Sequence, residues 1–311
     1  MKSIIISGIS GFMGYNVSNY LKDSYEIVGL SRDKNKVVNG LTYEEIYKMR
    51  LDDYFAFIHL AGKAHDLKNT NNDYAYIDAN TNLTIKLFDL FLKSKCKIFI
   101  FMSSVKAIAD TLEGVLTEET EANPQTPYGK SKRAAEEYIL SKKIPKNKKV
   151  YILRPCMVHG PNNKGNLNLL YSIINRGIPY PLGSYENKRS FLSVQNLNFI
   201  IKELIIKQPK SDTFNVADDK AISTVSLVKL IAKYAKKKVV ILRVPKVIIN
   251  FTATAGNFFK LPLNKNRLDK LTENYVVSNT KIKAQLGKKL PLSTEEGLKK
   301  TIQSFNIQND D

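Results

Sequence analysis

The fold is decided by residues 3–14, which read SIIISGISGFMG. The first five are mostly isoleucine and predict a short buried strand. Gly8, Gly11 and Gly14 follow at three-residue intervals, and a helical pattern occupies Tyr15–Lys22. Glycine lets the backbone turn tightly and approach a pyrophosphate without a Cβ in the way, and the start of a helix presents unpaired N–H groups to phosphate. A strand, a glycine turn and a helix in this order predict a dinucleotide-binding site, although the spacing is GxxGxxG rather than GxGxxG.

The end of the second predicted strand, Tyr25–Leu30, bears on the choice of cofactor. An acidic residue normally stands there when the adenosine ribose of NAD is bound. This chain has Ser31 and Arg32 instead, and Asp33 comes slightly late. A guanidinium can pair bidentately with a 2′-phosphate, which favours NADP(H). NAD(H) stays open, because Arg32 and Asp33 also fit a solvated turn.

Strand and helix patterns alternate through the first half of the chain and break down after about Pro161. Alternating βαβ units imply a parallel sheet with helices on both faces. We therefore expect an α/β fold, a Rossmann-type doubly wound parallel sheet with a smaller C-terminal substrate-binding lobe. The NAD(P)-binding domain is predicted over residues 1–165, with 192–217 returning to it, and the lobe over 166–191 and 218–311. Further strands are predicted at Phe55–Leu60, Lys97–Met102, Val150–Leu153, Thr213–Val216 and Val239–Arg243, and further helices at Ile77–Ser94, Pro127–Leu140, Asn196–Lys207 and Val225–Lys236.

Tyr128 and Lys132 form a YxxxK pair, four residues apart on one face of a predicted helix. A lysine ammonium near a phenol favours the phenolate, which lowers the tyrosine pKa towards neutrality. Such a tyrosine can give or take the proton when a carbonyl and a carbinol interconvert, and the lysine can hold the nicotinamide ribose. Ser104 follows a buried strand at the carboxyl edge of the sheet, where its hydroxyl can bond the reacting oxygen. The glycine turn, the strand-end serine and the YxxxK pair, in that order, are jointly specific.

At this point the chain resembles the extended short-chain dehydrogenase/reductases, the NAD-dependent epimerase/dehydratase family. The resemblance implies an NAD(P)-dependent enzyme that acts on a nucleotide-linked sugar. Within the family the chain is most similar to the bacterial UDP-N-acetylquinovosamine 4-reductases, from which Ala107–Asp110 departs. The family resemblance rests on Gly8–Gly14, Phe57–Gly62, Asn80, Ser103–Ser104, Tyr128–Lys132 and Arg154–Pro161; the closer one rests on Ser103–Lys106, Asn123–Lys132, Lys164–Asn166, Pro181–Gly183 and Arg189–Ser190.

The resemblance also implies the residues of the site. Ser104, Tyr128 and Lys132 are the expected catalytic residues. The nucleotide sugar is expected to contact Ser104, Lys106, Asn166 and Arg189, with the arginine on its diphosphate. The cofactor, NADP(H) or NAD(H), is expected to contact Gly8, Ser10, Gly11, Phe12, Met13, Gly14, Ser31, Arg32, Leu60, Ala61, Gly62, Asn80, Tyr128, Lys132, Pro155 and Met157.

Three reactions of this family were compared with these residues, and they do not fit equally well. Our main expectation is reduction of the C4 keto group of a UDP-4-keto-6-deoxy-N-acetylhexosamine, on the way to O-antigen or capsule sugars. A UDP-hexose or UDP-N-acetylhexosamine 4-epimerase would use the same groups and regenerate its cofactor at each turnover. A 4,6-dehydratase needs an acid and a base after the serine, and Val105 and Lys106 stand there instead. The complete Ser, Tyr and Lys set argues against a non-catalytic NADP-sensing or structural role.

Composition sets further expectations. The 311 residues include 48 basic and 29 acidic side chains, a net charge of +19. The lysines are scattered and no basic stretch alternates with aromatic residues, so nucleic acid is not an expected partner. Cys96 and Cys156 suggest no disulfide, and His59, His65 and His159 lack metal-ligand spacing, so no metal is expected.

No segment has the apolar length of a membrane span. The rather apolar stretch Val244–Leu261 is expected to be a core helix or a peripheral membrane contact. We expect a cytoplasmic protein and, because the family is often dimeric, a homodimer.

Overall fold

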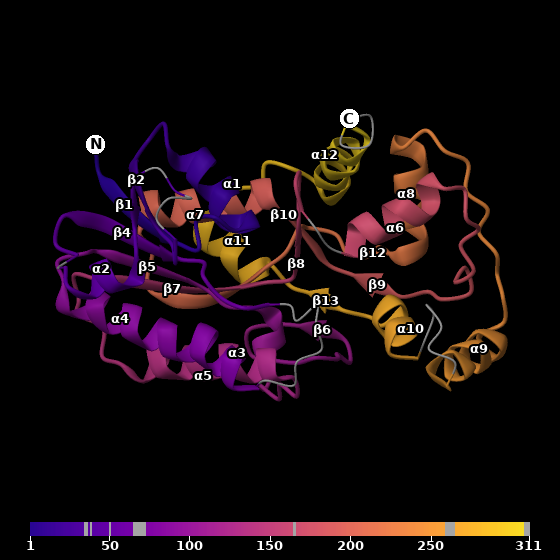
Figure 1. The fold of residues 1–311 in the computed structure, drawn as a ribbon, viewed down its shortest axis with the longest axis horizontal. Helices are drawn as coiled ribbons and strands as arrows, with labels where there is room; N and C mark the ends of the chain where they lie inside the picture. Colours follow the sequence, from indigo (N-terminus) through magenta and orange to yellow (C-terminus); the bar gives the residue numbers. More distant parts are fainter. Residues whose placement is uncertain are drawn as a thin grey trace.

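A seven-stranded parallel sheet forms the centre of the molecule, in the order β11-β7-β5-β4-β1-β2-β3 (Figure 1). The computed structural model describes residues 1–33, 37, 39–49, 51–64, 73–163, 166–258 and 265–307. The strand order reverses between β1 and β4, and ligands bind at such a switch point in open α/β sheets. The Rossmann-type fold is confirmed. The strands of this sheet are β1 (Ser3–Ser7), β2 (Glu26–Leu30), β3 (Gly40–Leu41), β4 (Tyr54–His59), β5 (Ile98–Met102), β7 (Lys149–Pro155) and β11 (Asp212–Val216).

Both faces of the sheet are covered, which explains the unbroken isoleucine run of β1. Ile4 and Ile6 pack in the apolar cluster that holds α1 (Phe12–Leu21), α7 (Val194–Lys207) and α11 (Thr280–Leu286). Ile5 packs on the other face, in the cluster that holds α4 (Leu83–Lys93) and α5 (Pro127–Ser141). A strand buried on both faces has no polar side to alternate with its apolar one.

A third apolar cluster forms the C-terminal lobe. Its members come from α6 (Asn166–Asn175), α8 (Thr224–Tyr234), α9 (Lys246–Phe258), α10 (Lys265–Thr272) and α12 (Thr294–Ile307). Tyr275, β13 (Val276–Val277) and α11 pack instead with the core of the sheet. The chain therefore returns once more to the nucleotide-binding half after α10, and the boundaries at residues 166, 192 and 218 stay a prediction.

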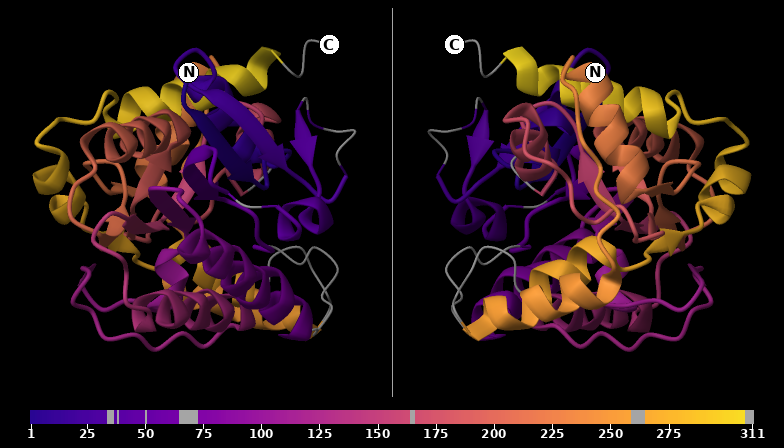
Figure 2. Two further views of the ribbon diagram at one scale, coloured as in Figure 1. Left: turned by 90° about the vertical axis from the view of Figure 1, so that its left-hand side faces the viewer. Right: turned by 90° about the vertical axis from the view of Figure 1, so that its right-hand side faces the viewer.

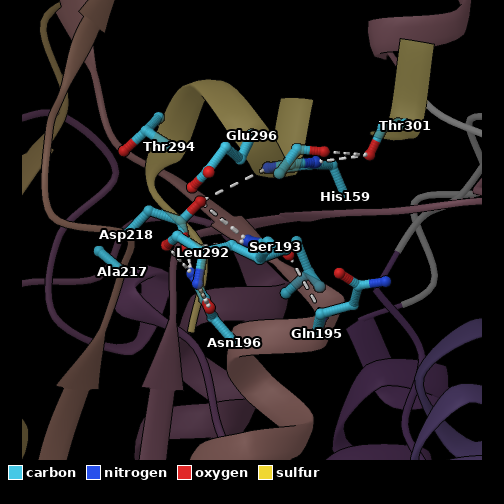
Figure 3. A network of polar contacts seen from close by, with 12 residues as sticks. His159, Ser193, Gln195, Asn196, Ala217, Asp218, Leu292, Thr294, Glu296 and Thr301 are labelled. Atoms are coloured by element: carbon cyan, nitrogen blue, oxygen red, sulfur yellow. Dashed lines mark hydrogen bonds and ion pairs between the residues drawn. The ribbon is translucent and has the colours of Figure 1, made fainter. Parts of the chain in front are cut away.

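A buried carboxylate, Asp218, joins the two halves (Figure 3). It accepts hydrogen bonds from Ser193 N (3.1 Å) and Asn196 Nδ2 (2.7 Å) at the start of α7. Asn196 also bonds the backbone that leads into α12, in both directions (2.9 and 3.0 Å). His159, the last residue of β8 (Met157–His159), bonds Thr301 of α12 through Nδ1 (2.9 Å), and its Nε2 lies 3.7 Å from Asp218.

Two predicted elements differ from the structure. Val239–Arg243 makes only two isolated bridges, Tyr180↔Ile241 and Leu182↔Arg243, and is not a strand. The facing segment contains Pro179 and Pro181, which have no N–H to donate to a ladder. The predicted helix Ile77–Ser94 is helical from Asp73 to Lys93 but contains a π-helical segment, η2, at Ile77–Asn82.

Candidate active site

The turn between β1 and α1 is built by glycines with different roles. Gly8 has φ of +70°, and a Cβ there would lie 2.7 Å from Ala61 N, so it also lets β4 approach. A Cβ on Gly14 would lie 2.2 Å from Gly8 O, so this glycine lets α1 pack against the turn. Gly11 is the N-cap residue of α1 and supplies no side-chain cap. The uncapped helix start, with Ser10, Phe12 and Met13 around it, fits a pyrophosphate.

The end of β2 carries a hydroxyl and a guanidinium. Ser31 is buried, and its Oγ accepts a hydrogen bond from Asp33 N (3.3 Å). Arg32 is exposed, and its charge acts on Tyr43, whose pKa burial raises to about 12. A role of Ser31 and Arg32 in binding the adenosine ribose stays a prediction.

The structure brings Gly62, Asn80 and Lys132 together beside the switch point. A Cβ on Gly62 would lie 2.6 Å from Asn80 Oδ1 and 3.1 Å from Lys132 Nζ. Asn80 lies in η2 and is fully buried; its Nδ2 donates to Ser131 Oγ (2.9 Å) and Lys63 O (3.0 Å). π-Helical turns are frequent at functional sites, and this one sets the asparagine against α5.

A series of buried hydrogen bonds connects Asn80 to the ends of β4 and β1. Thr84 Oγ1 donates to Asn80 O (2.5 Å) and bonds His59 Nε2 (2.9 Å), and His59 Nδ1 bonds Ser7 Oγ (2.6 Å). Burial, together with the charge of Lys132, lowers the pKa of His59 to about 3. His59 is therefore a neutral core residue that orders the site and not an acid or base within it.

Ser104 and Tyr128, two of the three residues expected to be catalytic, lie beside each other in the structure. Ser104 ends the segment after β5, and its side chain hydrogen-bonds Tyr128, the second residue of α5. The N-terminus of α5 is fixed by Thr126, whose Oγ1 accepts from Gly129 N (3.2 Å), and by Asp110, whose carboxylate bonds both the N–H and the hydroxyl of Thr126. The segment Ala107–Asp110, unusual for the subgroup in sequence, thus positions the tyrosine.

The predicted lowering of the tyrosine pKa by Lys132 is wrong for this structure. Burial raises the pKa of Tyr128, and the hydrogen bond from Ser104 only partly opposes it. Lys132 donates from Nζ to Met102 O (2.8 Å), and burial lowers its own pKa to about 8. Desolvation is the largest cause of the shift at this tyrosine, and the Lys132 ammonium is held by the carbonyl at the end of β5.

A buried ion pair, which the sequence analysis missed, fixes α5 against the sheet. Glu136, one turn after Lys132, accepts two hydrogen bonds from Arg154 Nε (2.9 and 3.1 Å) and one from its Nη2 (2.6 Å). Ser103 Oγ donates to the same carboxylate (2.5 Å). The sequence could have indicated this pair. Glu136 is an acidic residue eight positions after Tyr128, on the same face of the helix, and a buried charge requires a partner.

The expected substrate residues Lys106 and Arg189 lie on either side of Tyr275. Lys106 Nζ donates to Asp110 O (2.6 Å) and stands 4.2 Å from the centre of the Tyr275 ring. Arg189, in β9 (Lys188–Arg189), forms a backbone bridge with Tyr275, and its Nη2 lies 3.2 Å from Glu273 Oε1. Both belong to one cluster to which the C-terminal lobe contributes, and sequence reasoning did not find Glu273 or Tyr275.

The remaining expected residues are placed as follows. Leu60 is buried at the end of β4, Pro155 ends β7 beside Val216, and Met157 is half-buried in β8. Of Asn166 only the backbone, at the start of α6, is described, and Lys164, Gly165 and His65 lie outside the described residues. Within the described ranges no cluster of three potential metal ligands occurs.

This fold and site define a Rossmann-type dinucleotide-binding protein with a serine–tyrosine–lysine centre. The sequence profile of the NAD dependent epimerase/dehydratase family matches residues 4–217, and the chain belongs to this family. It is 33% identical to a UDP-glucose 4-epimerase of Vibrio cholerae, over 98% of this chain and 95% of that one.

Other relatives are more distant. An Escherichia coli O157:H7 N-acetyl-α-D-glucosaminyl-diphospho-ditrans,octacis-undecaprenol 4-epimerase is 24% identical (90% and 84% covered), and a Pseudomonas aeruginosa GDP-6-deoxy-D-mannose reductase is 23% identical (78% and 83% covered). Two solved structures share the fold. They are a Thermotoga maritima UDP-glucose 4-epimerase with UDP-glucose (TM-score 0.77, 21% identity, 99% of both chains) and a human epimerase family protein with NADPH (0.78, 15%, 97% and 99%).

Proposed function

We propose that this protein is a nucleotide-sugar oxidoreductase acting at C4, and that it reduces the keto group of a UDP-4-keto-6-deoxy-N-acetylhexosamine with NADPH. The observation that carries the proposal is that the Ser104 hydroxyl lies beside the Tyr128 phenol at the carboxyl end of β5, one strand from the switch point of the sheet. A hydroxyl pair at this place can bind a keto oxygen and deliver a proton to it.

In this mechanism the nicotinamide, when bound, supplies a hydride to C4. Ser104 donates a hydrogen bond to the keto oxygen and orients it. Tyr128 transfers its phenolic proton to that oxygen as charge develops there, and the product is the alcohol. Burial raises the pKa of Tyr128, so the phenol carries the proton that this step transfers, and the hydrogen bond from Ser104 opposes the accompanying loss of acidity. Lys132 and Asn80, whose side chains both lie close to Gly62, would hold the nicotinamide ribose.

The reductive direction is supported by the end of β2. Ser31 and Arg32 fit the 2′-phosphate of NADPH, and an exchangeable reductant suits net reduction. A relative at 23% identity is a GDP-6-deoxy-D-mannose reductase. Elimination of water across C5–C6 is disfavoured, because Val105 is apolar and Lys106 is held by Asp110 O and by the ring of Tyr275.

The second candidate is a UDP-sugar 4-epimerase. The Vibrio cholerae relative, which matches nearly the whole chain, carries that activity in its name, as does the Thermotoga maritima structure. An epimerase must remove the C4 hydride and return it to the other face. The same serine and tyrosine serve both steps, so residue placement does not separate the two reactions. A homodimer and a cytoplasmic location stay predictions.

One experiment distinguishes these candidates. The purified enzyme is incubated with a UDP-4-keto-6-deoxy-N-acetylhexosamine plus NADPH or NADH, and separately with UDP-glucose and UDP-N-acetylglucosamine without added cofactor. We expect stoichiometric oxidation of NADPH, in preference to NADH, and no interconversion of the second pair with their C4 epimers. Epimerisation without NADPH consumption would replace the reductase with the epimerase. Cofactor binding without turnover in either assay would contradict both.

A further inference from the structure

The outer face of α9 is apolar although solvent reaches it. Ile249 and Ala253 point inward and belong to the apolar cluster of the lobe. Val247 and Phe251, four residues apart on the other side of the helix, are 79% and 75% exposed, and Ile248 is 52% exposed. A surface helix normally carries polar residues on its solvent side, so this face indicates contact with an apolar phase.

The position of α9 leaves this face accessible. Figure 1 shows the helix at the edge of the molecule opposite β2 and α2 (Tyr43–Tyr47), and the right-hand view of Figure 2 looks onto that end. The segment that leads into α9 continues the apolar surface, because Val240 and Leu242 are also exposed.

The stretch of chain that contains α9 carries charge of a single sign, up to the exposed Asp269 on the neighbouring α10. Between Asp219 and Asp269 the sequence has eleven lysine and arginine residues and no acidic residue, whereas the whole chain has 29 acidic residues among 311. Lys236–Lys238 and Arg243 precede the helix and Lys246 opens it, and all five side chains are exposed. Exposed apolar side chains flanked by lysines are the composition of a helix that lies in the interface of an anionic bilayer.

We propose that α9, together with the preceding segment 236–245, docks on the surface of a membrane that contains anionic phospholipids. The apolar side chains enter the headgroup boundary and the lysines contact lipid phosphate. A second copy of this chain is a poorer occupant, because two such surfaces would bring like charges together. The docking is interfacial; within the described ranges no helix is long and apolar enough to cross a bilayer.

Vesicle cosedimentation tests this proposal. The full-length protein is mixed with vesicles of phosphatidylcholine alone or of phosphatidylcholine with phosphatidylglycerol. We expect binding only to the anionic vesicles, weakening as salt is raised. The double variant Val247→Asp/Phe251→Asp should bind at least tenfold more weakly. The triple variant Lys236→Glu/Lys237→Glu/Lys238→Glu should also lose binding, since one charge near the surface changes partitioning by roughly fivefold.

The matched control is Ile206→Asp, which puts the same charge on an apolar residue that is 53% exposed on α7. This variant should bind like wild type, and every variant should keep its thermal midpoint and its turnover of a soluble nucleotide sugar. The proposal is overturned if wild type ignores anionic vesicles, or if Val247→Asp/Phe251→Asp binds as wild type does. It is likewise overturned if no form of the protein binds vesicles and Val247→Asp/Phe251→Asp converts a dimer into a monomer in gel filtration. That result would make the surface a contact between two copies of the chain.

Discussion

At the scale of single residues, the proposed mechanism depends on Tyr128 as the proton donor. We expect Tyr128→Phe to reduce kcat by on the order of 10²–10⁴-fold, because a positioned general acid contributes about that much. NADPH binding, measured by fluorescence titration, should be nearly unchanged, since the ring stays in place. The exposed Tyr15 on α1 provides a control variant, Tyr15→Phe, with full activity. Turnover by Tyr128→Phe within a few-fold of wild type would remove the tyrosine from its assigned role.

The buried ammonium of Lys132 is expected to lower the stability of the fold. Burial lowers its pKa to about 8 from 10.5, so the unfolded chain holds more protons than the folded one between these values. The free energy of unfolding should therefore rise as pH increases from about 8 to 10.5, and the full penalty is present at pH 7. We expect Lys132→Met to abolish activity, to raise stability at pH 7 by on the order of 2 kcal/mol, and to flatten that pH dependence. Urea unfolding at pH 7 and pH 10 measures this, with exposed Lys130→Met as the control; a less stable Lys132→Met would contradict the argument.

At the scale of elements, α5 carries the tyrosine and the lysine, and Glu136 holds the helix in place. Removing one charge of a buried pair leaves the other uncompensated, which typically costs about 3–5 kcal/mol. We expect Glu136→Gln to lower the thermal midpoint and kcat together, because Arg154 loses its counter-charge and the amide keeps only one acceptor oxygen for the donors of Arg154 and Ser103. Differential scanning calorimetry and steady-state kinetics check this. Glu137→Gln removes an exposed pair with Arg133 and should change neither.

The pair of Arg189 and Glu273 links β9 to the segment before β13 and bears on substrate binding. If Arg189 grips the diphosphate, charge-assisted bonds of roughly 1.5–3 kcal/mol are lost in Arg189→Ala. We expect weaker UDP binding in calorimetry with unchanged NADPH affinity. Glu273→Gln should act in the opposite direction, because the carboxylate 3.2 Å from Nη2 competes with the diphosphate. Weaker UDP binding in both variants would show that the pair is structural.

The accuracy with which the sequence predicts a helix or strand depends on the length of that element. Long buried strands and amphipathic helices were predicted within a few residues, since hydrophobic periodicity defines them. Strands of two or three residues, such as β3 and β13, contain too few residues for any period to show. Val239–Arg243 has the composition of a strand, but its pairing is limited by prolines some sixty positions earlier in the sequence. Ser104, Tyr128 and Lys132 could be proposed from the sequence because they fall in one ordered motif, whereas Glu273 and Tyr275 come beside Arg189 and Lys106 only through the tertiary fold.

At the scale of the whole molecule, Asp218 couples the sheet to the lobe that lies beside it (Figure 1). Its carboxylate accepts from Ser193 N and Asn196 Nδ2, and these residues tie α7 to the entry of α12. In Asp218→Asn the side chain keeps a single acceptor oxygen. Its new NH₂ group cannot accept the hydrogen bonds that Ser193 N and Asn196 Nδ2 donate. Leaving buried donors unsatisfied costs about 1–3 kcal/mol.

We expect Asp218→Asn to lower the free energy of unfolding by that amount and to raise KM for the nucleotide sugar, while the affinity for NADPH stays near wild type. The reason is that the cofactor site is built by β1, α1 and β4, whereas Arg189 and Glu273 depend on the position of the lobe. The neighbouring Asp219 bonds Lys283 and Asn279 at the surface, so Asp219→Asn is the matched control and should leave KM unchanged. Equal losses of NADPH and nucleotide-sugar affinity in Asp218→Asn would mean that the network stabilises the fold as a whole and not the placement of the lobe.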